Sequence, residues 1–167
     1  STEAALAIHV GLKQCLVDDD VRVRAAALMA FSGLGCASSR DLLLLLAERC
    51  ADAEADMRCS AVRGLGRVAA RGSDAHIVQV VAACFQDRCA RVRRAAVATL
   101  GQLPVARDAA AVPALLGVLA RDSDPDVRQE AAVAVQRHAL RGDAVVVDAL
   151  IASLEEGSTV VCVAVLR

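Results

Sequence analysis

The sequence predicts an all-α protein built as a solenoid, in which similar helical hairpins stack side by side. Its 167 residues contain arginines at steps of 34, 35 and 35 positions: Arg24, Arg58, Arg93 and Arg128. Six residues before each of them lies an aspartate: Asp18, Asp52, Asp87 and Asp122. A hydrophobic residue directly precedes each arginine, and an alanine follows it by three positions. Self-similarity at a period of roughly 20–50 residues is the signature of stacked repeats.

Within each period, apolar residues spaced by three and four positions predict two amphipathic helices. A turn that contains the aspartate separates the two helices, and a glycine or proline follows the second helix. The predicted helix pairs cover residues 12–16 and 23–34, 42–50 and 57–69, 77–85 and 92–103, and 112–119 and 125–140. A fifth first helix fits at about residues 145–154. The valine-rich residues 160–166 are the one stretch whose pattern also permits a strand.

The fourth hairpin carries the clearest signals for the ends of a helix. Residues 112–119 place apolar side chains at positions i, i+3, i+4 and i+7. Asp124 is suited to be the N-cap of the next helix and Pro125 its first residue. Gly142 is placed to end that helix.

We expect residues 1–167 to form a single repeat domain. The repeats fall at about residues 3–37, 38–72, 73–106, 107–142 and 143–167, or about four and a half hairpins. The last repeat is degenerate or truncated, because Val163 occupies the position of the recurring arginine. Its tail, residues 160–166, is apolar, so we expect further sequence or another subunit to cover this edge.

The recurring aspartates and arginines have a structural interpretation. The aspartate lies in the turn between the two helices, and the arginine lies near the start of the second helix. A guanidinium group can donate two parallel hydrogen bonds to one carboxylate. The spacing therefore predicts a ladder of ion pairs within or between repeats. A catalytic role is not expected, because the pair recurs in every unit.

The recurring block resembles the HEAT repeat, in particular the short HEAT-like repeats of the phycobilisome-lyase type. The resemblance rests on Val112–Leu116 with Asp122–Ala132, and on the matching blocks Asp18 with Val23–Ala27, Asp52 with Met57–Ala61, and Asp87 with Val92–Ala96. It covers about residues 3–157. The resemblance implies a right-handed α–α superhelix whose second helices line a concave surface, which is generally used to hold proteins.

Composition narrows the classes of partner. The net charge is −1, so no general attraction to nucleic acid or to an anionic membrane is expected. No apolar run is long enough for a membrane span. The seven cysteines are odd in number and form no CxxC motif. Since most stand where other repeats carry Ala, Leu or Val, we expect them to be small buried hydrophobes in an intracellular, reducing compartment.

No cofactor, metal site or catalytic residue is predicted. The histidines are His9, His76 and His138, and none is followed by glutamate. The His-Glu ligand pairs of deoxyhypusine hydroxylase, an enzyme made of such repeats, are therefore absent. Two Gly-x-Gly segments are present, but neither is followed by the Lys-Ser/Thr of a phosphate-binding loop, so no such loop is predicted.

Arginines on the second helices form the candidate binding surface. Arg63, Arg67 and Arg71 are spaced four residues apart, and Arg137 and Arg141 occupy the positions of the last two, two repeats later. If the second helices line a groove, these side chains project along it. The candidate ligand is an acidic protein segment or a set of phosphates.

The sequence favours a non-catalytic scaffold for protein interaction or assembly, as part of a larger chain or complex. One alternative is a bilin lyase or isomerase subunit that acts on phycobiliproteins. Another alternative is a solenoid that binds nucleic acid. The slightly acidic net charge disfavours it, and so does the scarcity of aromatic residues, since the sequence contains only two phenylalanines and no tyrosine or tryptophan.

Overall fold

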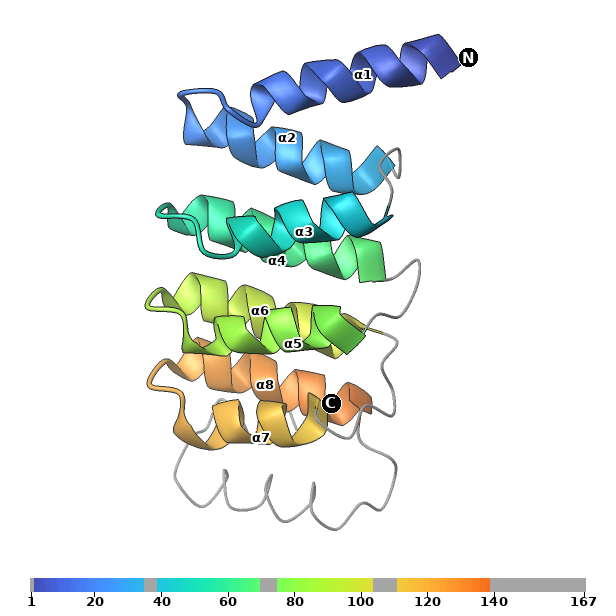
Figure 1. Ribbon diagram of the computed structural model, residues 1–167. Helices are drawn as coiled ribbons and strands as arrows, with labels where there is room; N and C mark the ends of the chain where they lie inside the picture. The colour runs from blue at the N-terminus through green and yellow to red at the C-terminus, as the bar shows by residue number, and fades with distance from the viewer. Residues whose placement is uncertain (1, 35–38, 70–74, 104–110, 139–167) are drawn as a thin grey trace.

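The computed structural model describes residues 2–34, 39–69, 75–103 and 111–138. These residues form eight α-helices and one short 3₁₀ helix, which stack as successive pairs along one axis (Figure 1). The helices are α1 (Thr2–Cys15), α2 (Val21–Leu34), α3 (Ser39–Arg49), α4 (Ala55–Ala69), α5 (Ala75–Ala83), η1 (Cys84–Gln86), α6 (Ala90–Gln102), α7 (Ala111–Arg121) and α8 (Pro125–His138). The α-solenoid predicted from the sequence is confirmed.

The turns between paired helices are closed by their aspartates. In the fourth pair, one carboxylate oxygen of Asp124 accepts hydrogen bonds from the backbone N–H groups of Asp126 at 2.9 Å and Val127 at 3.2 Å. These N–H groups have no partner inside the helix, so the aspartate caps α8. Pro125 is the first residue of α8, where its missing N–H costs nothing.

The second helices begin slightly earlier than the apolar pattern alone indicated. In the first three pairs they start at Val21, Ala55 and Ala90, two residues before the hydrophobic position that precedes the arginine. The predicted helix at 77–85 ends at Ala83 and continues as the 3₁₀ turn η1. The predicted fifth hairpin and residues 160–166 lie outside the described residues, and the repeat boundaries stay predictions.

A single apolar core runs along the stack between the two rows of helices. The alanine three positions after each ladder arginine is at most 4% exposed in all four pairs: Ala27, Ala61, Ala96 and Ala131. The hydrophobic residue before the arginine is fully buried in three of them: Met57, Val92 and Val127. Val23 is 37% exposed, because no earlier second helix packs on α2 within the described residues.

Small residues bring neighbouring second helices close together. A Cβ atom placed on Gly101 of α6 would lie 2.7 Å from the Cβ of Ala134 in α8. One repeat earlier, a Cβ on Gly66 would lie 2.8 Å from Cγ2 of Thr99, which α6 contributes. Real side chains do not approach so closely, so glycine at these two positions sets the distance between repeats.

Candidate binding groove

A buried ion pair joins the second and third repeats. Arg58 of α4 donates from Nε to Oδ2 of Asp87 at 2.7 Å and from Nη2 to Oδ1 at 2.9 Å. The two side chains are 6% and 9% exposed. The same arginine donates from Nη1 to the carbonyl oxygens of Asp52 and Ala53, both at 2.9 Å. Arg58 therefore binds the turn of its own repeat and the carboxylate of the next repeat.

The third and fourth repeats are joined in the same way. Arg93 donates from Nε and Nη2 to the carboxylate oxygens of Asp122, each at 2.8 Å, and from Nη1 to the carbonyl oxygen of Asp87 at 2.9 Å. Hydrogen bonding to these arginines holds the pKa values of Asp87 and Asp122 below the usual aspartate value, against the opposing effect of burial.

These lowered pKa values predict that the protein loses stability in acid. A carboxylate whose folded pKa lies below its unfolded value of about 3.9 contributes stability that is complete above about pH 4. That contribution is lost as the pH falls through the folded pKa. We expect the free energy of unfolding, measured by denaturant titration, to fall from neutral pH to about pH 3. The Asp87→Asn/Asp122→Asn variant should show a shallower fall, and an unchanged slope would contradict this account.

The ladder does not extend to the first repeat. Arg24 donates from Nη1 to the carbonyl oxygens of Asp18 at 2.7 Å and Asp19 at 2.9 Å, as its counterparts do. Among the described residues, however, it forms no ion pair with Asp52, which instead lies 3.9 Å from Arg49. Arg24 and Asp52 are 28 residues apart, one fewer than the 29 that separate Arg58 from Asp87. This corrects the expectation of one ion pair at every step.

The last ladder arginine binds its own turn only, as far as the described residues reach. Arg128 donates from Nη1 to the carbonyl oxygen of Asp122 at 2.8 Å. The position 29 residues after Arg128, which corresponds to Asp87 and Asp122, is Gly157 and lies outside the described residues.

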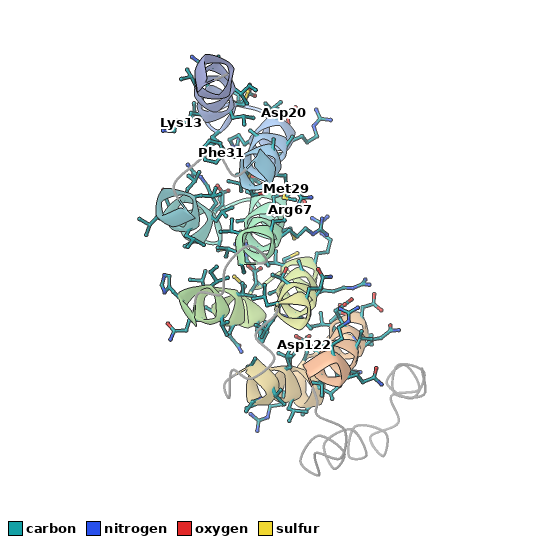
Figure 2. All side chains as sticks on the ribbon, turned by 90° about the vertical axis from the view of Figure 1, so that its right-hand side faces the viewer. Lys13, Asp20, Met29, Phe31, Arg67 and Asp122 are labelled. Atoms are coloured by element: carbon teal, nitrogen blue, oxygen red, sulfur yellow. The ribbon has the colours of Figure 1, made fainter. Side chains whose placement is uncertain are left out.

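The second helices line a groove along one side of the stack. It encloses about 1040 Å³, and its lining residues come from α2, α4, α6 and α8. In Figure 2 these four helices form one of the two rows of the stack. Five of the lining residues are arginines: Arg22, Arg63, Arg67, Arg91 and Arg94. Two are acidic, Asp56 and Glu130.

Two of the arginines predicted from the sequence, Arg63 and Arg67, lie together in this groove, on adjacent turns of α4. Arg137 is exposed near the end of α8, where its Nη1 lies 3.9 Å from a Cβ placed on Gly101, and it does not line the groove. Arg71 and Arg141 fall outside the described residues.

Ion pairs between repeats cross the groove, and sequence reasoning missed them. Arg91 of α6 donates to Asp56 of α4 at 2.7 Å, and Arg94 of α6 donates to Glu130 of α8 at 3.3 Å. A signal was present, because the position two residues before each ladder arginine alternates in charge along the stack: Arg22, Asp56, Arg91 and Asp126. At the edge of the groove, Arg22 binds Asp20 of its own turn at 2.7 Å, and this hydrogen bond lowers the pKa of Asp20 to about 2.

Arg63 and Arg67 differ from the other groove arginines. No carboxylate of the described residues lies within 4.0 Å of either guanidinium group. Arg67 donates from Nη1 to the carbonyl oxygen of Met29 in α2 at 3.3 Å. Figure 2 shows Arg67 beside Met29, on the side of the stack formed by the second helices. The groove therefore contains two neighbouring positive charges that no acidic side chain neutralises within the described part of the chain.

The described cysteines are free thiols, of which Cys59 and Cys84 are buried and Cys15, Cys50 and Cys89 are half-buried. Cys50 and Cys84 interact across the boundary between the second and third repeats. The neighbouring Cys84 thiol, together with burial, raises the pKa of Cys50, and the neighbouring Cys50 lowers the pKa of Cys84. Cys36 and Cys162 lie outside the described ranges.

In the parts of the chain that the structure describes, no group of three or more His, Cys, Asp or Glu side chains is arranged to hold a metal ion. Within the same ranges, no helix has the length and apolar character needed to cross a membrane.

Comparison with known proteins agrees with this architecture. A family model described as HEAT repeats matches residues 42–136 and also residues 79–164. The chain is also similar to the crystal structure of an engineered protein from the Northeast Structural Genomics Consortium, with a TM-score of 0.58 and 19% sequence identity. That similarity covers 89% of this chain and 67% of the other, and it concerns the fold alone. No curated protein matches the chain.

Proposed function

Because the chain belongs to the HEAT repeat family, we propose that it is a non-catalytic binding module that holds a protein partner in the groove of α2, α4, α6 and α8. HEAT repeats generally serve as scaffolds for protein interaction, and the family is typically not enzymatic. The observation that carries the proposal is the groove itself, which is lined by four successive second helices. Such a surface can contact a partner over several repeats at once.

The composition of the groove supports a protein ligand. Its lining mixes arginines and carboxylates with small apolar residues such as Ala95 and Ala98 and with the hydroxyl groups of Ser60 and Thr99. Protein interfaces combine these features, whereas pockets for small molecules are more enclosed and mostly apolar. The assignment to the phycobilisome-lyase type of repeat, and the bilin and nucleic-acid alternatives, stay predictions, and no feature of the groove favours them.

Site-specific photo-crosslinking tests the proposal. A photoreactive amino acid is placed at Ala98, in the groove, or at Ala120, which is exposed on α7. We expect Ala98 to crosslink to a protein partner that Ala120 does not reach, and mass spectrometry of the adduct identifies that partner. Purified partner is then titrated against the Ala98→Trp and Ala120→Trp variants.

The two tryptophan variants make the same change on different faces. Ala98→Trp should weaken binding of the purified partner about tenfold or more, because the indole fills the groove, whereas Ala120→Trp should leave binding unchanged. Circular dichroism and thermal melting verify that both variants are folded. If only Ala120→Trp weakened binding, the partner would bind the opposite face and the proposal would be wrong.

A further inference from the structure

The charges in the groove indicate the chemistry of its ligand, and this inference rests on the proposed function. We infer that the bound partner segment is acidic, and that its carboxylates bind the guanidinium groups of Arg63 and Arg67. The segment lies along α4 at the centre of the groove.

The first observation is the distribution of charge among the groove arginines. Three of the five have a carboxylate within hydrogen-bonding distance: Arg22 with Asp20, Arg91 with Asp56, and Arg94 with Glu130. Arg63 and Arg67 have none among the described residues. Two like charges one helical turn apart destabilise a helix slightly. A ligand that brings carboxylates to both arginines removes this repulsion and gains charge-assisted hydrogen bonds.

The second observation is that Arg67 is already held in place. Its Nη1 atom donates to the carbonyl oxygen of Met29, 38 residues earlier in the chain. A guanidinium group carries five N–H donors, so this bond leaves others for a ligand. Anchoring one end of the side chain reduces the entropy that binding would otherwise cost.

The third observation is the spacing of the two arginines. Residues at i and i+4 of a helix have Cβ atoms about 5–6 Å apart. In an extended peptide, alternate side chains lie on one side at a separation of roughly 6.6 Å. The two spacings match closely enough for long side chains to adjust. The expected ligand therefore carries acidic residues at alternate positions of an extended segment.

The remaining lining favours a peptide over a nucleic acid. Asp56 and Glu130 neutralise Arg91 and Arg94, so the groove offers no continuous row of unpaired positive charges for a line of phosphates. Nucleic-acid grooves also use aromatic side chains on which bases stack. The two phenylalanines of the sequence, Phe31 and Phe85, are buried at 5% and 6% exposure. Neither is among the residues that line the groove.

Fluorescence anisotropy with defined probes tests the inference. The first probe is a short labelled peptide of alternating glutamate and serine. The second replaces each glutamate with glutamine, and the third is a labelled single-stranded oligonucleotide. We expect binding of the glutamate peptide that weakens as salt is raised, and binding of the other two that is at least about tenfold weaker.

Matched variants assign the binding to the two arginines. Arg63→Gln/Arg67→Gln should reduce affinity for the glutamate peptide about tenfold or more. Lys13→Gln/Arg121→Gln removes the same charge from two exposed residues that do not line the groove, and should have little effect. In Figure 2, Lys13 lies on the other side of the stack from Arg67. In the charge-reversed Arg63→Glu/Arg67→Glu variant, preference should switch to a peptide of alternating lysine and serine.

Two results would overturn the inference. One is equal loss of peptide binding in both double variants, which would mean that only overall charge matters. The other is binding of the oligonucleotide in preference to the glutamate peptide. Failure of the proposed function gives a different result. In that case the partner identified by crosslinking would bind the Ala98→Trp variant as tightly as the unchanged protein. If Ala98→Trp abolishes partner binding but Arg63→Gln/Arg67→Gln does not, the groove binds a partner that is not acidic.

Discussion

Replacing Asp87 with alanine is expected to lower the free energy of unfolding by about 3 kcal/mol, because it leaves a buried arginine without its carboxylate. The substitution removes both hydrogen bonds that Arg58 donates to the carboxylate of Asp87, and the Arg58 side chain is only 6% exposed. It also removes the acceptor for the backbone N–H of Cys89, which lies 2.8 Å from Oδ1 just before α6. The second and third repeats then lose their main polar connection. Denaturant unfolding followed by circular dichroism measures the loss.

The first repeat supplies a control for this experiment. Asp18 occupies the same position of its repeat, but it is exposed, and within the described residues its carboxylate accepts a single hydrogen bond, from the backbone N–H of Asp20 at 2.8 Å. Asp18→Ala should change the free energy of unfolding by no more than about 0.5 kcal/mol, as is usual at exposed sites. Equal losses in Asp18→Ala and Asp87→Ala would show that the bridge between repeats contributes nothing beyond the local turn.

Replacing Gly101 with alanine is expected to lower the free energy of unfolding by about 1–2 kcal/mol. The new Cβ atom would lie 2.7 Å from the Cβ and 3.0 Å from the Cα of Ala134. The Cα atom is part of the backbone of α8, so no side-chain rotation relieves the contact, and α6 and α8 must move apart. Because Gly101 is the second-last residue of α6, the gain in helix propensity offsets only part of this cost.

Replacing Gly117 with alanine should instead raise the free energy of unfolding. Gly117 lies in the middle of α7, and a Cβ placed there meets no atom of the described residues within 4 Å. Alanine then restricts the unfolded chain and favours the helix, so we expect a gain of about 0.5–1 kcal/mol. A stabilised Gly101→Ala variant would mean that the two second helices can separate without loss. The glycine would then not set the spacing between repeats.

Local patterns in the sequence predicted the helix pairs and the start of α8, whereas its predicted end near Gly142 lies outside the described residues. Apolar spacing predicts a helix directly, and the capping role of Asp124 depends only on residues next to it in the chain. The pattern did not predict the 3₁₀ turn η1, since apolar residues at 77–85 continue the helical spacing beyond the end of α5. The residue at which a helix ends depends on the turn that follows, and the spacing of apolar residues does not predict that turn.

Interactions between repeats were harder to predict. The sequence suggested a ladder at every step, but the ion pairs at Arg58 and Arg93 have no counterpart between Arg24 and Asp52. The interval between Arg24 and Asp52 is one residue shorter than the interval between the arginine and the aspartate of the two ion pairs that form. The groove pairs Arg91–Asp56 and Arg94–Glu130 were not predicted at all. They join residues about one period apart, and the distance between such residues depends on how closely the helices stack.

The sequence by itself determined that this chain forms repeated helical hairpins, because period, apolar spacing and turn residues act within a few positions along the chain. It also located the arginines of α4. Only the tertiary structure decided that Arg63 and Arg67 have no carboxylate partner among the described residues while their neighbours are paired. Which charges meet depends on the separation of adjacent second helices, and contacts such as Gly101 with Ala134 set that separation.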